Sequence, residues 1–179
     1  MLAIYIFIGS GIILVSTLIF MYFDGKNFRK NMKHKYEVKI SNDLYKKKIE
    51  SAIKYNMNGY IFEDFISYIF KLLGYKVSQT TGSHDMGKDI ILNKNIYVEC
   101  KCYKDTKISS PSINKLIGAC ASDGIKQAIF ITTGNGYTKD AMKIVNNAKE
   151  RINVECWDMD DILNLCLKCD HYKVLQWIK

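Results

Sequence analysis

Three charged residues interrupt two short apolar runs in the stretch GSHDMGKDIILNKNIYVECKCYK, residues 82–104. Asp89 stands at the start of the first run, and Glu99 and Lys101 lie within the second. If residues 93–95 form a three-residue hairpin loop, the resulting register places Asp89 opposite Glu99. Lys101 then lies on the same face as both carboxylates, because side chains alternate along a strand. The spacing therefore predicts two carboxylates and one ammonium group at one place.

Two directly opposed carboxylates have Cβ atoms roughly 5 Å apart and repel each other. A divalent cation would offset this repulsion, and Mg²⁺, with Mn²⁺ as the alternative, prefers carboxylate oxygens. Lys101 could then orient or activate a water, or stabilise charge on a phosphate. A second interpretation stays open: Asp89 ends a loop, and Glu99 and Lys101 form an exposed ion pair of little energetic value. A one-residue slip would also separate the carboxylates.

The flanking patterns predict the elements that must position these residues. A helix capped by Asn58 should end near Gly74, with an apolar stripe facing the core. The remaining pattern predicts strands at 75–80, 127–133 and 152–157, a hairpin of the two apolar runs on either side of residues 93–95, and helices at 110–121, 137–149 and 158–168. This α-β-β-β-α-β-α-β-α order favours an α/β fold with a mixed sheet flanked by helices. The predicted stripe consists of Ile61, Phe62, Phe65, Ile69, Leu72 and Leu73.

The spacing of Asp89, Glu99 and Lys101 resembles the PD-(D/E)xK nuclease signature. More specifically, residues 58–165 resemble the Mrr-type restriction endonuclease family. Four segments carry this resemblance in order: GYIFEDFISYIFKLLGYKV, DMGKD, VECKCY and ITTGNGYTKDA. The resemblance implies a restriction-endonuclease-like α-β-β-β-α-β core.

The resemblance also implies roles for individual residues. Asp89 and Glu99 would hold the metal, and Lys101 would serve the attacking water. Glu63, on the first helix of the domain, matches an acidic position that completes the metal site. The alternative for Glu63 is an exposed charge on the polar face of that helix, beside Asp64.

Three further residues match positions around the site and are predicted to support it. Asp85 and Gly87 fall in the loop before Asp89, where Asp85 is expected to shape the loop through local hydrogen bonds rather than to bind metal. Thr133 falls in the later ITTGNGYTKDA block, where Thr132 and Thr138 also match. The sequence assigns no role to these threonines.

The activity implied is Mg²⁺-dependent hydrolysis of double-stranded DNA by an endonuclease of the restriction or DNA-defence type, without a small-molecule cofactor. Cleavage of both strands by one site per chain suggests a homodimer. The alternative is a catalytically silent DNA-binding or membrane-tethered interaction protein on the same fold. Because Arg is nearly absent from the domain, no helix stands out as a reader of base edges.

The start of the chain has a different composition. Residues 1–23 contain no charged side chain and are long enough to cross a bilayer as a helix. Residues 24–57, predicted to form a basic juxtamembrane linker and a lysine-rich helix at 40–56, carry most of the formal charge of +8. These patterns predict a single-pass cell-membrane protein that contacts lipid through residues 1–23 and the basic flank, with its nuclease-like domain in the cytoplasm. The predicted domain spans residues 58–168, and residues 169–179 are a C-terminal tail.

The six cysteines are typical of a reducing compartment, in which they pack as small apolar side chains. Cys166, Cys169 and His171 have a local spacing that also occurs in zinc sites. A structural zinc site needs four ligands, and no second CxxC or HxxxH motif is present. Helix packing is therefore the favoured role of these cysteines, with zinc as the alternative.

Overall fold

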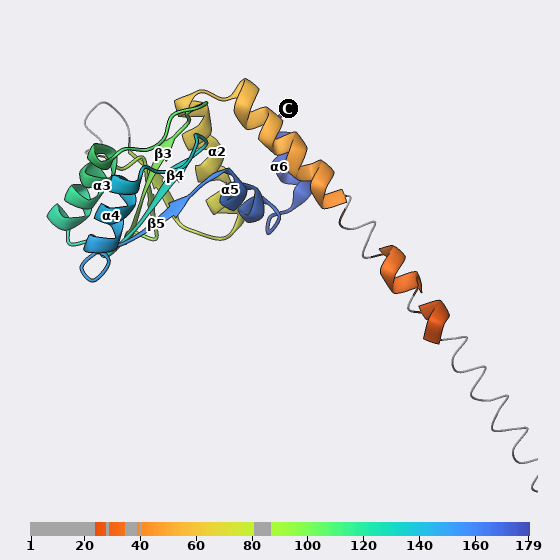
Figure 1. Ribbon diagram of the computed structural model, residues 1–179. Coiled ribbons are helices and arrows are strands. Elements are labelled where there is room, and N and C mark those ends of the chain that lie inside the picture. The colour runs from red at the N-terminus through yellow and green to blue at the C-terminus, as the bar shows by residue number, and fades with distance from the viewer. Residues whose placement is uncertain (1–23, 28, 35–38, 40, 81–86) are drawn as a thin grey trace, which may run out of the picture. The chain divides into compact units, whose positions relative to one another are not determined.

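A computed structural model of the chain describes residues 24–27, 29–34, 39, 41–80 and 87–179 (Figure 1). The chain divides into two compact units, Met1–Leu44 and Tyr45–Lys179. All described residues of the first unit are helical. The second unit contains every residue for which the sequence predicts a chemical role.

Helices and strands of the second unit follow the predicted order. Residues 45–56 are helical and precede the labelled elements. These are α2 (Gly59–Leu72), β1 (Val77–Gln79), β2 (Ile90–Leu92), β3 (Ile96–Lys101), α3 (Ser110–Ser122), β4 (Gln127–Thr132), α4 (Lys139–Ala148), β5 (Asn153–Trp157), α5 (Met159–Cys166) and α6 (His171–Trp177). The α/β class is confirmed, and α6 is an additional helix within the residues predicted to be a tail.

The five strands form one mixed sheet in the order β1-β2-β3-β4-β5. Strands β1, β2 and β3 are antiparallel neighbours, whereas β3, β4 and β5 run parallel to one another. Parallel neighbours need crossover connections, which α3 and α4 provide. Because parallel strands end at a common edge, Lys101 at the end of β3 lies beside Thr132 at the end of β4.

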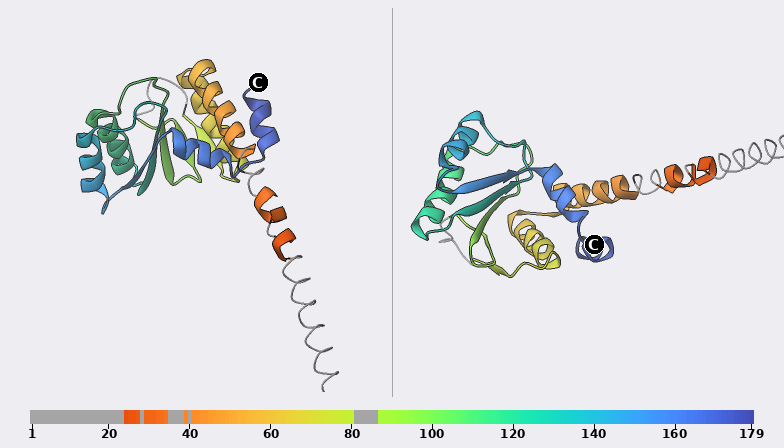
Figure 2. Two further views of the ribbon diagram at one scale, coloured as in Figure 1. Left: turned by 45° about the vertical axis from the view of Figure 1, so that its right-hand side comes forward. Right: turned by 90° about the horizontal axis from the view of Figure 1, so that it is seen from below.

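Two apolar cores cover the two faces of this sheet. Helices α3 and α4 lie on one face, and α2, α5 and α6 lie on the other (Figure 2). Residues 45–56 join the second group and contribute Tyr45, Ile49 and Ile53 to it. Complete burial of a large apolar side chain contributes about 1.5–3 kcal/mol to stability. The largest fully buried side chains include Phe62, Phe65, Phe70 and Phe130.

Helix α2 begins and ends as predicted, but its apolar stripe is narrower. The Asn58 side chain accepts a hydrogen bond from the N–H of Ile61 at 3.0 Å. Gly74, just beyond the helix, has a φ of 88°, which favours glycine. Phe62, Phe65 and Ile69 of the predicted stripe are buried, and Leu72 and Leu73 pack partly against the same core. Ile61 is 39% exposed, so its assignment to the core is wrong.

Helix α6 forms because its first N–H groups are capped and its inner side packs against the core. The Asp170 side chain accepts hydrogen bonds from the N–H groups of Tyr172 and Lys173. Val174 is fully buried, and the Trp177 ring lies 5.1 Å from that of Phe65. An N-cap, one buried side chain and one partly buried ring are enough to order a short helix against an existing core.

The prediction of a single-pass cell-membrane protein is wrong. Within the described residues, no helix is long and apolar enough to cross a bilayer. The described helices of the domain are instead amphipathic, each with one apolar side that packs against the sheet. Residues 1–23, on which the predicted membrane segment and its lipid contact rested, lie outside the described residues.

Candidate functional site

The turn between β2 and β3 sets the register of the hairpin. Asn93 and Lys94 both have positive φ angles, 51° and 67°, which let three residues reverse the chain. Pairing then runs from Leu92 opposite Ile96 to Ile90 opposite Val98. This is the register predicted from residues 93–95. Asp89, predicted at the start of the first strand, comes directly before β2 instead.

Two hydrogen bonds hold Asp89 on either side of Glu99. The N–H of Asp89 donates to the carbonyl oxygen of Val98 at 2.8 Å, and Oδ2 of Asp89 accepts from the N–H of Cys100 at 2.7 Å. Asp89 is 6% exposed and Glu99 is 2% exposed. The two carboxylates are therefore brought together in a place from which water is largely excluded. The alternative of a solvated edge strand does not describe this arrangement.

Burial raises the pKa of Asp89 to about 7, and the negative charges of Glu99 and Glu63 act in the same direction. The Cys100 N–H and the Lys101 ammonium oppose this rise without cancelling it. A buried carboxyl beside like charges is disfavoured in its ionised form. Near neutral pH, Asp89 therefore takes up a proton far more readily than an exposed aspartate.

Lys101 forms an ion pair with one carboxylate oxygen of Glu99, and the other oxygen of Glu99 is not bonded to it. The Lys101 Nζ lies 2.5 Å from Oε1 of Glu99. Burial acts to lower the pKa of Lys101, but the hydrogen bond to Glu99 and the charges of Glu99 and Asp89 outweigh it, so that the pKa is raised. Oε2 of Glu99 is buried and has no hydrogen-bond partner among the described residues. An unsatisfied buried carboxylate oxygen is costly, which makes it the strongest indication of a ligand.

Glu63 lies in the first turns of α2 and is half-buried. Its charge contributes to the raised pKa of Asp89, so it belongs to the electrostatic surroundings of the site. The neighbouring Asp64 is exposed and accepts a hydrogen bond from the Gln79 side chain at 2.7 Å. Across the described part of the chain, no group of three or more His, Cys, Asp or Glu side chains could hold a metal ion.

Thr132 and Thr133 hold the end of β3, a role that the sequence did not reveal. The Thr132 hydroxyl and the Thr133 N–H both donate to the carbonyl oxygen of Lys101, at 3.2 and 3.1 Å. The Thr133 hydroxyl donates to the carbonyl oxygen of Tyr103 at 2.7 Å. These threonines thus fix the backbone that carries Lys101. Thr138, the third threonine of the block, caps α4 through its side chain.

Gly87 immediately precedes the charged hairpin and packs closely against α3. Its φ is 89°, and a Cβ placed on it would lie 2.7 Å from Cγ of Lys115. Only glycine fits such a position without strain. Asp85, the other supporting residue predicted from this loop, lies outside the described residues.

A pocket of about 660 Å³ opens where the parallel strands end. Its lining includes Cys102 and Tyr103, which follow Lys101 directly, and Thr133 after β4. Open α/β sheets commonly bind ligands beyond the carboxyl ends of their strands. Asp89, Glu99 and Lys101 are not among the residues that line this pocket, so it adjoins the chain that follows Lys101 rather than the carboxylates themselves.

Cys166 and Cys169 pack in the core near the end of α5. Cys166 is fully buried, and its carbonyl oxygen accepts a hydrogen bond from the Tyr45 hydroxyl at 3.2 Å. Burial raises the pKa of the Cys166 thiol to about 12. The ring of His171 stacks on that of Tyr45 at 3.9 Å. These contacts favour helix packing over the zinc alternative, because no three metal-ligating side chains among the described residues come together to hold an ion.

The fold is a mixed sheet whose hairpin carries a buried carboxylate pair, with a lysine two residues after the second carboxylate. This combination defines a restriction endonuclease-like α/β domain. Residues 54–166 match the Mrr catalytic domain family, described as "Restriction endonuclease", and the chain belongs to this family.

Two known proteins are similar to this chain. The uncharacterized protein y4cE of Sinorhizobium fredii (strain NBRC 101917 / NGR234) is 29% identical over 113 residues, which cover 58% of this chain and 28% of that protein. The structure of the DNA modification-dependent restriction endonuclease AspBHI matches 75% of this chain and 38% of its own, with a TM-score of 0.56 and 18% identity. At that identity the likeness concerns the fold. The chain thus spans well under half the length of both proteins.

Proposed function

We propose that this protein is a metal-dependent DNA endonuclease of the restriction or DNA-defence type. The observation that carries the proposal is the buried pair Asp89 and Glu99, in which Oε2 of Glu99 lacks a partner among the described residues. Membership in the restriction endonuclease family supports DNA as the substrate, and AspBHI, which shares the fold, is by name a DNA modification-dependent restriction endonuclease.

The residues present fit a divalent cation. Asp89 and Glu99 supply hard carboxylate oxygens, and Glu63 adds negative charge nearby. Two protein carboxylates suffice for Mg²⁺, which usually keeps several waters and takes its other ligands from substrate phosphates. The absence of a three-residue metal cluster among the described residues is therefore compatible with Mg²⁺, and Mn²⁺ prefers similar ligands.

Each side chain has a distinct part in the proposed reaction. A bound divalent cation would lower the pKa of a water and offset the charge of the scissile phosphate. Lys101 has a raised pKa and therefore stays protonated, so it acts as a hydrogen-bond donor and a positive charge rather than as a base. Its ammonium holds Glu99 in place through their ion pair. The same ammonium is available to orient a water or to stabilise charge that develops on the phosphate.

Incubation of the full-length chain with supercoiled plasmid and MgCl₂ or MnCl₂ tests the proposal. We expect the wild-type protein to convert the plasmid to nicked or linear forms, and Asp89→Ala and Lys101→Ala to reduce the rate by about 10²- to 10³-fold, the scale for loss of one electrostatic group. Linear product formed in a single encounter would support a homodimer that cuts both strands. Equal nicking by all three proteins would indicate a contaminating nuclease and contradict the proposal.

Two neighbouring acidic residues of α2 provide a matched comparison. Glu63→Ala is expected to raise the Mg²⁺ concentration needed for half-maximal cleavage, because its charge acts on the site. Asp64→Ala removes a carboxylate that is exposed and bonded to Gln79, and should leave that concentration unchanged. Wild-type protein that binds DNA in a gel-shift assay but never cleaves it would instead favour the silent DNA-binding alternative.

A further inference from the structure

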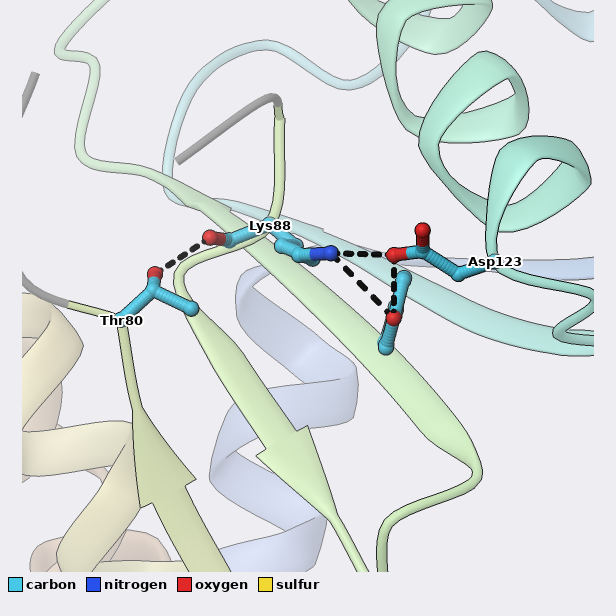
Figure 3. A network of polar contacts seen from close by, with 4 residues as sticks. Thr80, Lys88 and Asp123 are labelled. Atoms are coloured by element: carbon cyan, nitrogen blue, oxygen red, sulfur yellow. Dashed lines mark hydrogen bonds and ion pairs between the residues drawn. The ribbon is translucent and has the colours of Figure 1, made fainter. Parts of the chain in front are cut away.

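A second polar cluster lies on the same hairpin, and the proposed function does not use it. The Nζ of Lys88, the residue just before Asp89, makes an ion pair with Oδ2 of Asp123 and lies 3.2 Å from the Tyr97 hydroxyl (Figure 3). The Tyr97 hydroxyl donates to the same oxygen of Asp123 at 2.6 Å. Lys88, Tyr97 and Asp123 are called the Lys88 network.

The Lys88 network joins three separate elements of the fold. Lys88 leads into β2, Tyr97 belongs to β3, and Asp123 is the C-cap of α3. The Lys88 ammonium also lies 4.4 Å from the centre of the Tyr97 ring, a favourable cation–π distance. Only 16% of the Lys88 side chain is exposed, which is unusual for a lysine unless it is paired. The cluster therefore ties the start of β2 to the end of α3.

The backbone between Lys88 and Asp89 is held from its other side by Thr80. The Thr80 hydroxyl donates to the carbonyl oxygen of Lys88 at 2.6 Å (Figure 3). The Thr80 N–H donates to the carbonyl oxygen of Asp89 at 3.0 Å. Gly87 rests on the side chain of Lys115 in α3. Residues 87–89 are thus fixed between the end of β1 and helix α3, and the Lys88 side chain makes the charged part of this attachment.

The attachment of residues 87–89 restrains the backbone next to the carboxylate pair. Asp89 and Glu99 repel each other, and a small movement of the backbone at Asp89 would relieve the repulsion. Reacting groups must be held close to their productive positions, and a displacement of about 1 Å can cost as much as 10²-fold in rate. A cluster that resists this movement keeps the carboxylate pair together.

We propose that Lys88 and Asp123, bridged by Tyr97, are positioning residues that hold Asp89 opposite Glu99. This inference rests on the proposed function for its effect on the reaction rate. Its effect on the position of Asp89 does not depend on cleavage, because the hydrogen bond from the Cys100 N–H to Oδ2 of Asp89 reports that position directly.

The test compares five variants of the full-length chain: Lys88→Met, Asp123→Asn, the double variant, Lys88→Arg and the control Lys126→Met. Lys126 is exposed and precedes β4, at the opposite end of the parallel strands from Lys101. The first measurement is hydrogen exchange and the proton chemical shift of the Cys100 amide by NMR, relative to the β4 amides. The second is kcat and KM on duplex DNA with MgCl₂.

We expect Lys88→Met and Asp123→Asn each to speed exchange at Cys100 about tenfold relative to β4, an opening confined to this region. Both should lower kcat about tenfold with KM within twofold. The double variant should be no worse than the poorer single variant, because the two residues act as a unit. Lys88→Arg, which keeps the ion pair, should recover at least half of the wild-type kcat, and Lys126→Met should match wild type.

An unchanged Cys100 amide in both single variants would overturn the inference, as would a wild-type kcat in both. Equal effects of Lys126→Met would also overturn it, because they would show a general loss of lysine charge. If the wild-type chain does not cleave DNA, the proposed function fails. The Cys100 measurement then decides by itself whether the Lys88 network positions Asp89.

Discussion

The β2–β3 hairpin carries two clusters of charge that differ in balance. Asp89, Glu99 and Lys101 provide two carboxylates for one ammonium, with a buried carboxylate oxygen that lacks a partner among the described residues. The Lys88 network provides one carboxylate for one ammonium, and the Tyr97 hydroxyl both donates and accepts within it. Both clusters draw on the residues just before β2 and on β3, and the Lys88 network adds Asp123 from the end of α3.

The two clusters have opposite effects on stability because their net charges differ. Paired groups in the Lys88 network favour the folded state, and hydrogen bonds to charged groups are stronger than neutral ones. The excess carboxylate beside Glu99 disfavours the folded state unless a proton or a cation is added. A charge imbalance in a buried place therefore marks where a charged ligand belongs, whereas a balanced cluster marks a structural attachment.

The largest effect is expected when the excess negative charge of the carboxylate pair is removed. Asp89→Asn keeps the shape of the side chain and its acceptor for the Cys100 N–H, but it removes the charge that burial disfavours. Cleavage should fall by about 10²- to 10³-fold. At pH 8 without metal, the same variant should be more stable than wild type by about 2 kcal/mol, measured by urea unfolding.

The dependence of this stability difference on pH has a definite sign. The pKa of Asp89 in the folded chain, about 7, exceeds its ordinary value of 3.8. The folded state therefore binds the proton more tightly, and stability is lost as the pH rises from 4 through 7. Asp89→Asn should abolish this loss, and the exposed Asp64→Asn should not. Wild type that gains stability over this range would contradict the assignment of Asp89 as the strained member of the pair.

An intermediate effect is expected at the attachment between the two clusters. Gly87→Ala would place a Cβ 2.7 Å from Cγ of Lys115 at a φ of 89°. We expect a loss of about 1–2 kcal/mol in the free energy of unfolding. Gly118→Ala is the matched control, because a Cβ at Gly118 in α3 meets nothing within 4 Å.

Gly118→Ala should stabilise the chain by about 0.5–1 kcal/mol, since alanine is the better helix former. Opposite signs for the two glycine variants are therefore the expected outcome in urea unfolding. A stabilising Gly87→Ala would show that the segment before Asp89 is not held in the conformation described.

The smallest effect is expected within the balanced cluster. Tyr97→Phe removes one hydroxyl but leaves the contact between Lys88 and Asp123 in place. Thermal or urea unfolding should show a loss of about 1 kcal/mol, the usual value of a hydrogen bond. Tyr55→Phe, at a tyrosine that is 82% exposed, should show none. A fall in kcat larger than that of Lys88→Met would contradict the leading part given to the ion pair.

The register of the hairpin could be predicted because local rules determine it. Three turn residues and the alternation of side chains are enough to bring Asp89 beside Glu99, and both are visible in sequence. The order of helices and strands followed from periodicity in the same way. The family resemblance added Glu63, whose position on α2 no local pattern relates to the hairpin.

Features that depend on distant partners were missed. Nothing near Lys88 shows that its partner is Asp123, 35 residues later. The exposure of Ile61 depends on how α2 lies on the sheet, and α6 depends on a core already built by α2 and residues 45–56. The membrane prediction relied on the apolar character and length of residues 1–23 and on the basic residues that follow them. Composition measures how a segment partitions between solvents, and it does not establish a spanning helix.

The different sequence separations of the two clusters also bear on how the domain folds. The contact between Asp89 and Cys100 closes a loop of 11 residues, whereas that between Lys88 and Asp123 closes one of 35. Short loops close at a smaller entropic cost, and isolated hairpins form within microseconds. We therefore expect the carboxylate pair to come together in an early, local step and the docking of α3 to lock it later, which φ-values measured in the hairpin and in α3 would test. In that order of assembly, the repelling carboxylates would lose their water only once the rest of the domain is in place to hold them.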